Sequence, residues 1–261
     1  MTNPFDPPPP AYSEIVFVTA TPQPQQRPEA APARSDTHPF PRALTVRFKR
    51  SWTKRDLQLY STDDDNSTPL HHVSIHTKRP HLVLHSSADN ASAPLATASY
   101  KDVWKSKPSS IVTLFPLPDA SVEEELEADI GLHTVFRFAL DVGRGKETQR
   151  EYFEWRTSRG EEVRALNDSR FRSGMKLVRL TGNPGGAAAS SSSDGKEIVA
   201  VWADQTSFSL TKVGKFEFIG SGATGEMGER FAVMAVVSCL RIWDTMFQIS
   251  QGIGSSNKSK Q

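Results

Sequence analysis

The sequence of 261 residues has few of the features that usually reveal a function. Its one cysteine, Cys239, has no intramolecular partner, which excludes a disulfide-stapled scaffold and favours a reducing compartment. A formal net charge of +1 provides no overall field for nucleic acid, and no nucleic-acid partner is expected. Residues 1–14 lack a basic region followed by an apolar core, so we expect no secretory signal. We therefore expect a cytoplasmic protein that could also lie peripherally at membranes.

The longest apolar stretch is too short to predict a membrane span. Residues 231–240 (FAVMAVVSCL) are interrupted only by Ser238, whereas a span needs about 20 predominantly apolar residues. Charged residues stand on both sides, with Arg230 before the stretch and Arg241 after it. A helix here would be apolar on every side, as core helices and membrane helices are. We expect a buried helix over residues 226–249, rather than a tail anchor.

Short strands fill most of the sequence ahead of this helix. Residues 43–49 (ALTVRFK) alternate, which places Leu44, Val46 and Phe48 on one face. Similar segments are residues 56–61, 73–77, 81–85, 95–100, 111–115, 133–141, 151–156, 162–166, 175–181, 197–203, 207–211 and 215–219. Many short strands without strand–helix alternation predict an antiparallel sandwich or barrel, and one-sided strands need an apolar partner. The helix supplies that partner.

Two insertions interrupt the strand pattern. Residues 119–129 (DASVEEELEAD) are rich in acids and predict either a short exposed helix or a solvated loop. Residues 182–195 (GNPGGAAASSSSDG) are of low complexity and predict a surface loop.

No group of residues predicts catalysis, a cofactor or a metal. There is no GxSxG motif, and Cys239 lies in apolar sequence, where a thiolate is disfavoured. Residues 220–225 (GSGATG) match GxGxxG, but no strand follows the helix, as dinucleotide binding would require. We favour the alternative that these glycines turn the chain from the wall of a barrel to its axis. The histidines at 71, 72, 76, 81 and 85 lack convergent acids, so we interpret them as surface strand residues rather than metal ligands.

Residues 1–40 are rich in Pro, Ala, Gln, Thr and Ser, and predict a disordered tail, as do residues 251–261. Pro9, Pro10 and Tyr12 form a sequence that resembles the PPxY ligand of WW domains, in which polyproline II prolines dock an aromatic groove. Asn3-Pro4-Phe5 resembles the NPF turn that EH domains bind. The alternative is that both are chance matches in a proline-rich tail.

Basic residues cluster in two parts of the predicted barrel and could bind an anionic headgroup or the acids of a partner. The candidate anion-binding residues are Lys49, Arg50, Lys54, Arg55, Arg170 and Arg172. The alternative is that they are outward charges on solvated strands.

Four segments carry a resemblance to a group of fungal proteins of the tubby C-terminal-like superfamily, which includes tubby, LURP-one-related and phospholipid-scramblase proteins. They are Phe153–Arg156 (FEWR), Met175–Leu180 (MKLVRL), Gly195–Ala203 (GKEIVAVWA) and Lys215–Trp243. The resemblance implies a mainly β fold over residues 41–250: a closed antiparallel barrel of about twelve strands with the C-terminal helix through its centre. The phosphoinositide-binding motif of tubby has no match here, so no lipid-contact residue is carried over.

The sequence thus predicts a non-enzymatic adaptor or binding module, whose tail recruits a WW-domain protein such as a HECT-type ubiquitin ligase, or an EH-domain protein. The alternative is a phosphoinositide or membrane-surface module that binds anionic phospholipid through basic barrel residues. A second alternative is a protein without small-molecule chemistry.

Overall fold

The computed structural model describes residues 39–49, 56–63, 68–101, 108–115, 120–129, 134–144, 147–166, 174–181, 191–205 and 211–256. The strands within them are β1 (Ala43–Phe48), β2 (Leu57–Ser61), β3 (His71–Ile75), β4 (Leu82–His85), β5 (Pro94–Tyr100), β6 (Ser110–Leu114), β7 (Val122–Asp129), β8 (Val135–Arg144), β9 (Glu147–Ser158), β10 (Gly174–Arg179), β11 (Ile198–Asp204) and β12 (Lys212–Phe218). The helices are α1 (Glu161–Ala165), α2 (Ser221–Thr224) and α3 (Gly228–Ser256).

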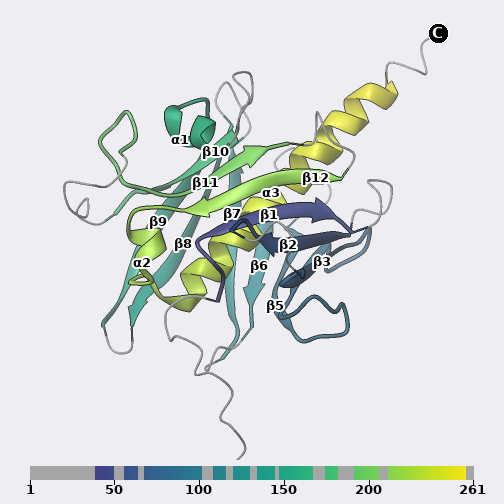
Figure 1. The fold of residues 1–261 in the computed structure, drawn as a ribbon, viewed down its shortest axis with the longest axis horizontal. Helices are drawn as coiled ribbons and strands as arrows, with labels where there is room; N and C mark the ends of the chain where they lie inside the picture. The colour runs from purple at the N-terminus through teal and green to yellow at the C-terminus, as the bar shows by residue number, and fades with distance from the viewer. Residues whose placement is uncertain are drawn as a thin grey trace, which may run out of the picture. The chain divides into compact units, whose positions relative to one another are not determined.

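The strands form one closed barrel in which each strand pairs antiparallel with its neighbours in sequence (Figure 1). The barrel closes where β1 pairs with β12, with Leu44 opposite Phe216. Inward side chains alternate with outward ones, and the inward set includes Phe138 paired with Phe153. This confirms the predicted fold class.

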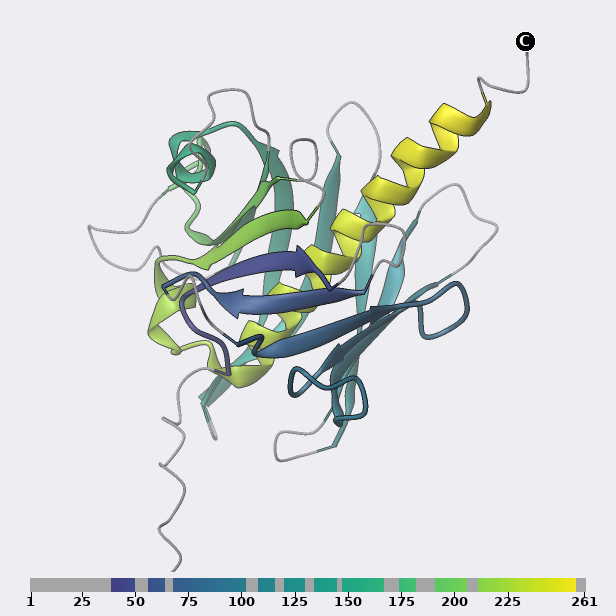
Figure 2. The ribbon, with the colours of Figure 1, turned by 45° about the vertical axis from the view of Figure 1, so that its right-hand side comes forward.

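Helix α3 fills the centre of the barrel. Its residues from Phe231 to Thr245 are all buried, and it packs against β5, β6 and β8. Figure 2 shows α3 running between the strands and leaving the barrel at one end, which we call the exit end. Residues 228–252 are the one described stretch long and apolar enough to cross a membrane by length and composition, and 78% of its most apolar window is buried. Such burial is typical of a core helix.

Two predicted segments have a different structure from the one expected. Residues 122–129 form strand β7 and not an exposed helix or loop, because Leu126 and Ala128 alternate inward while Glu125, Glu127 and Asp129 face solvent. Residues 162–166 were predicted as a strand, but α1 covers most of them. Val163 is the one buried residue of α1 and packs outside the barrel wall against Ile198 and Val201.

The ends of the chain differ in part from the prediction. Helix α3 extends to Ser256, beyond the predicted end at residue 249. The tail before residue 39, most of the predicted strand 207–211 and residues 182–190 of the predicted surface loop lie outside the described residues.

Candidate functional site

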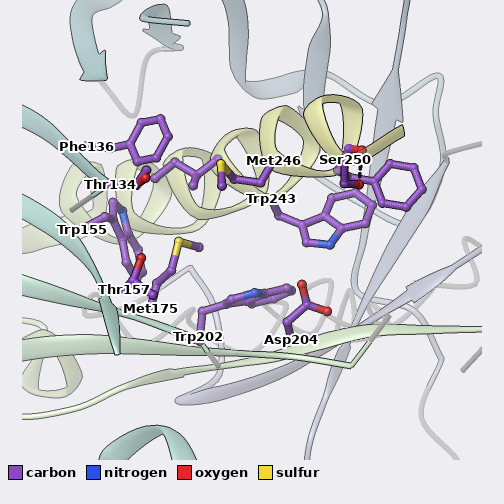
Figure 3. Close-up of a pocket in the computed structure, with 13 residues that line it drawn as sticks. Thr134, Phe136, Trp155, Thr157, Met175, Trp202, Asp204, Trp243, Met246 and Ser250 are labelled. Carbon is purple, nitrogen blue, oxygen red and sulfur yellow. Dashed lines mark hydrogen bonds between the residues drawn. The ribbon is translucent and has the colours of Figure 1, made fainter. Parts of the chain in front are cut away.

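A pocket of about 320 Å³ lies at the exit end, between α3 and the inward faces of β8 to β11 (Figure 3). Its lining residues are Thr134, Phe136, Trp155, Thr157, Gly174, Met175, Trp202, Asp204, Ile242, Trp243, Met246, Phe247 and Ser250. The volume falls at the lower end of the range for small-molecule pockets, roughly 300–1,000 Å³, and the mouth of a β-barrel is a common place for one.

Strand alternation explains why these side chains share a space. Trp155 and Thr157 are two residues apart near the end of β9, and Trp202 and Asp204 stand in the same relation on β11, so each pair points inward. Gly214 on β12 leaves room for the indole of Trp202, because a Cβ at residue 214 would lie 2.3 Å from that ring. The flat Trp202 ring therefore depends on a glycine in the neighbouring strand.

The floor of the pocket is buried and its mouth is exposed. Trp155 is fully buried, and its indole Nε1 donates a hydrogen bond to Ser238 Oγ at 2.9 Å. Trp243 stacks on Phe247 with ring centroids 5.4 Å apart. At the mouth, Thr157 and Ser250 are exposed and Met246 is 40% exposed. A ligand would reach the aromatic floor past these three side chains.

The described part of the lining is mostly apolar. Within the described residues, Asp204 is the one ionisable side chain that lines the pocket. Cys239 is buried on α3. Its burial, together with the charge of Asp204, raises the pKa of its thiol well above the usual value. The neutral thiol is a packing group.

A buried polar cluster lies at another part of α3. Arg241, which follows the predicted apolar stretch, and Asp244 are both fully buried and form an ion pair of 2.7 Å. The Arg241 guanidinium lies 3.7 Å from the centroid of the Tyr100 ring, and its Nε donates to Ser110 Oγ. Arg241 is therefore held against β5 and β6, and it does not line the pocket.

The GxGxxG segment serves the turn into α3, as the favoured alternative predicted. Gly220 and Gly225 have positive φ angles of 54° and 74°. Glu197 accepts a hydrogen bond from the Ser221 amide at 2.8 Å and lies 3.6 Å from Arg179. The amide at the start of α2 is thus already paired with a carboxylate of the chain itself.

The prediction of surface histidines is wrong for four of the five. His71, His72, His81 and His85 are buried, and only His76 is exposed. His72 alternates with the inward Val73 on β3, but its side chain has no exposed surface, and its ring lies 5.5 Å from the ring of His85 on β4. Among the described residues no group of three or more His, Cys, Asp or Glu could hold a metal.

The burial of His72 predicts a loss of stability in acid. Neither ring nitrogen of His72 has a hydrogen-bond partner, and burial, followed by the charge of Lys49, lowers its pKa below 6.5. Below pH 6.5 the imidazole of His72 binds a proton in the unfolded chain but stays neutral in the folded chain until the pH reaches its lowered pKa. The free energy of unfolding should therefore fall as the pH decreases, by at most about 1.4 kcal/mol per pH unit for this group. We expect urea titrations between pH 7.5 and 5.5 to show a smaller decrease for His72→Phe than for wild type.

His76→Phe is the matched control, because His76 directly follows the end of β3 and is exposed. Equal pH dependence in His72→Phe and His76→Phe would show that His72 does not carry the effect.

Most residues predicted to bind partners lie outside the described residues. These are Asn3, Pro4, Phe5, Pro9, Pro10, Tyr12, Arg50, Lys54, Arg55, Arg170 and Arg172. Lys49 is half-buried directly after β1. In the barrel, Arg150 pairs with Glu124, Arg156 with Glu154 and Asp194, Lys176 with Glu162, and Arg179 with Glu151 and Glu197. These four cations are thus already neutralised by acids of the chain.

The pocket residues were missed from the sequence, although a signal was present. In the strands that line the pocket, a polar residue stands two positions from an inward aromatic residue, as Thr134 does from Phe136 and Asp204 from Trp202. This pattern indicates inward strand positions that lie beyond the apolar core, where a pocket can form. The comparisons with known proteins add no further residue, because no family model, curated protein or solved structure matches the chain.

Proposed function

We propose that the chain is a non-enzymatic binding module: the barrel holds a small, largely apolar ligand in the exit-end pocket, and the N-terminal tail recruits protein partners. The observation that carries the first part is the pocket itself, whose buried floor consists of Trp155, Trp202, Trp243 and Phe136. Pockets lined by aromatic and apolar side chains with few polar groups bind apolar ligands in proteins generally. The closed barrel around its last helix also supports the proposed relationship to the tubby C-terminal-like superfamily. A different strand order in superposition with tubby would contradict that relationship.

Blocking the mouth of the pocket should abolish ligand uptake without unfolding the barrel. Ser250 lines the mouth and is exposed, so Ser250→Trp places a large side chain over the pocket at little cost in stability. We expect the neutral apolar dye Nile red to bind wild type with increased fluorescence, and Ser250→Trp to weaken its affinity about tenfold or more, a loss of roughly 1.4 kcal/mol.

The matched control is Gln251→Trp. Gln251 is exposed on the same helix but does not line the pocket, so its substitution adds the same indole to the surface. Equal dye binding by the two variants would contradict a role of the pocket.

The tail supplies the second part of the proposal. Pro9, Pro10 and Tyr12 match the WW-domain ligand, and Asn3-Pro4-Phe5 would recruit an EH-domain protein in the same way. Tyr12→Ala should abolish pull-down of the chain by isolated WW domains of HECT-type ligases, because the tyrosine fills its own pocket. Pro24→Ala, a tail proline outside the motif, should bind as wild type does. Undiminished pull-down of Tyr12→Ala would remove this part of the proposal.

A further inference from the structure

We propose that the exit-end pocket binds flat aromatic ligands in preference to saturated ligands of the same skeleton. This inference rests on the proposed function, because it names the chemical class of ligand for the same pocket. Three features of the described lining carry it: the face of the Trp202 indole, the edge of the Trp243 indole, and the thioethers of Met175 and Met246.

The Trp202 indole offers an aromatic face to the pocket. Its ring packs against Gly214 on β12, where an added Cβ would lie 2.3 Å from Cζ2 and 2.5 Å from Cη2. The wall of the barrel therefore supports the ring. Figure 3 shows the indole lying along β11, nearly edge-on to the viewer, with its other side turned toward α3. A ligand would meet this face already in place, which lowers the cost of ordering it on binding.

Trp243 approaches the same space from α3. Its indole stacks on Phe247 with ring centroids 5.4 Å apart and makes a T-shaped contact with Phe48 at 6.0 Å, so two aromatic neighbours hold it. In Figure 3 its edge is directed across the pocket toward Trp202. Aromatic rings have a negative face and a positive edge, and pairs of them favour offset stacking or edge-to-face contact. A flat aromatic ligand on Trp202 would receive the edge of Trp243 on its second face.

Two thioethers add to this aromatic environment. Met175 on β10 and Met246 on α3 both line the pocket, and Figure 3 shows them beside the space that the two indoles border. Methionine sulfur makes favourable contacts with aromatic rings, often at the ring edge. A saturated ring has no π-system with which the sulfur atoms or the indoles could make such contacts. The described lining therefore favours an aromatic ligand beyond the burial of its apolar surface.

The test compares coumarin with octahydrocoumarin, which are lactones of the same bicyclic skeleton, the first flat and aromatic and the second saturated. Neither carries a charge, so the comparison does not depend on the charges around the pocket. Binding to the full chain is measured by isothermal titration calorimetry. We expect coumarin to bind about tenfold more tightly. Burial alone predicts no such preference, because the saturated rings bury at least as much apolar surface. Equal or tighter binding of octahydrocoumarin would overturn the proposal.

Trp202→Leu removes the stacking face while keeping an apolar side chain. It should reduce the preference for coumarin to about twofold or less, chiefly by weakening the binding of coumarin. An unchanged preference in a folded Trp202→Leu protein would overturn the proposal.

A double variant keeps the test valid if Trp202→Leu fails to fold. Met175→Leu/Met246→Leu is a change of similar volume, which proteins usually tolerate, and it should reduce the preference for coumarin about threefold. Met234→Leu is the matched control, because Met234 is buried on α3 but does not line the pocket. An equal preference in the double variant and in Met234→Leu would overturn the proposal.

The dye separates failure of this inference from failure of the proposed function. Ser250→Trp should weaken the binding of coumarin as it weakens that of Nile red, because both ligands enter by the same mouth. Binding of Nile red without binding of either lactone would overturn the ligand class but leave the pocket a binding site. Failure of Nile red and both lactones to bind would overturn the proposed function as well.

Discussion

Val236→Asp should prevent the barrel from folding. Val236 is 2% exposed in the middle of α3, inside a continuous buried segment. An aspartate there would be a buried charge without a partner, which is one of the few single changes that cost more than about 4 kcal/mol, a large fraction of the stability of a typical domain. We expect the variant to lose its β circular dichroism signal or to be insoluble.

The matched control is Ile249→Asp, which places the same side chain on the same helix. Ile249 is 38% exposed beyond the buried segment and does not line the pocket, so this variant should fold. A soluble Val236→Asp protein with wild-type circular dichroism would show that α3 is not the core of the barrel.

Asp244→Ala should be the next most destabilising change. Asp244 Oδ2 accepts hydrogen bonds from Arg241 Nη1 and Gln248 Nε2, each at 2.7 Å, and both charged residues have no exposed surface. Loss of the carboxylate leaves the buried guanidinium without its counter-charge. Removing one partner of a buried ion pair typically lowers the free energy of unfolding by about 3–5 kcal/mol, and we expect a loss of this size here. The free energy of unfolding in urea measures it.

The double variant Arg241→Met/Asp244→Leu tests whether the cost of Asp244→Ala comes from leaving the charge of Arg241 unpaired. Replacement of both partners by apolar groups of similar volume is often neutral, so we expect the double variant to be more stable than Asp244→Ala. If the double variant is less stable than Asp244→Ala, the two residues stabilise the fold by more than the neutralisation of each other's charge.

The sequence predicted short antiparallel strands and a buried helix because both depend on patterns that are local, whereas the closed barrel of about twelve strands was implied by the resemblance to the tubby C-terminal-like superfamily. Alternation in residues 43–48 and an all-round apolar segment at 231–240 are readable without knowing the partner strands. Strand β7 was missed because charge hid its alternation: acids stand on both sides of Leu126 and of Ala128, and Glu124 is buried beside Arg150. Helix α1 was mistaken for a strand because five residues are too few to show a helical period.

The pocket depends on contacts that no local pattern shows. Trp155, Trp202 and Trp243 lie on three different elements, and their proximity follows from strand register and from the direction of α3. Similarly, His72 looks like a surface residue by its strand position, but its side chain is fully buried and its ring packs near that of His85 on the next strand. Such tertiary covering cannot be derived from periodicity alone.

Hydrogen exchange of the backbone amides in α3 tests the central claim, that the barrel is built around this helix. Amides in the core of a domain exchange only through global unfolding, whereas those of peripheral elements exchange by local opening. The structure predicts that residues 232–244 exchange as slowly as the amides of β9 and β11, and much more slowly than residues 249–252 at the projecting end. Exchange of residues 232–244 at the rate of the projecting end, while β9 and β11 stay protected, would contradict it.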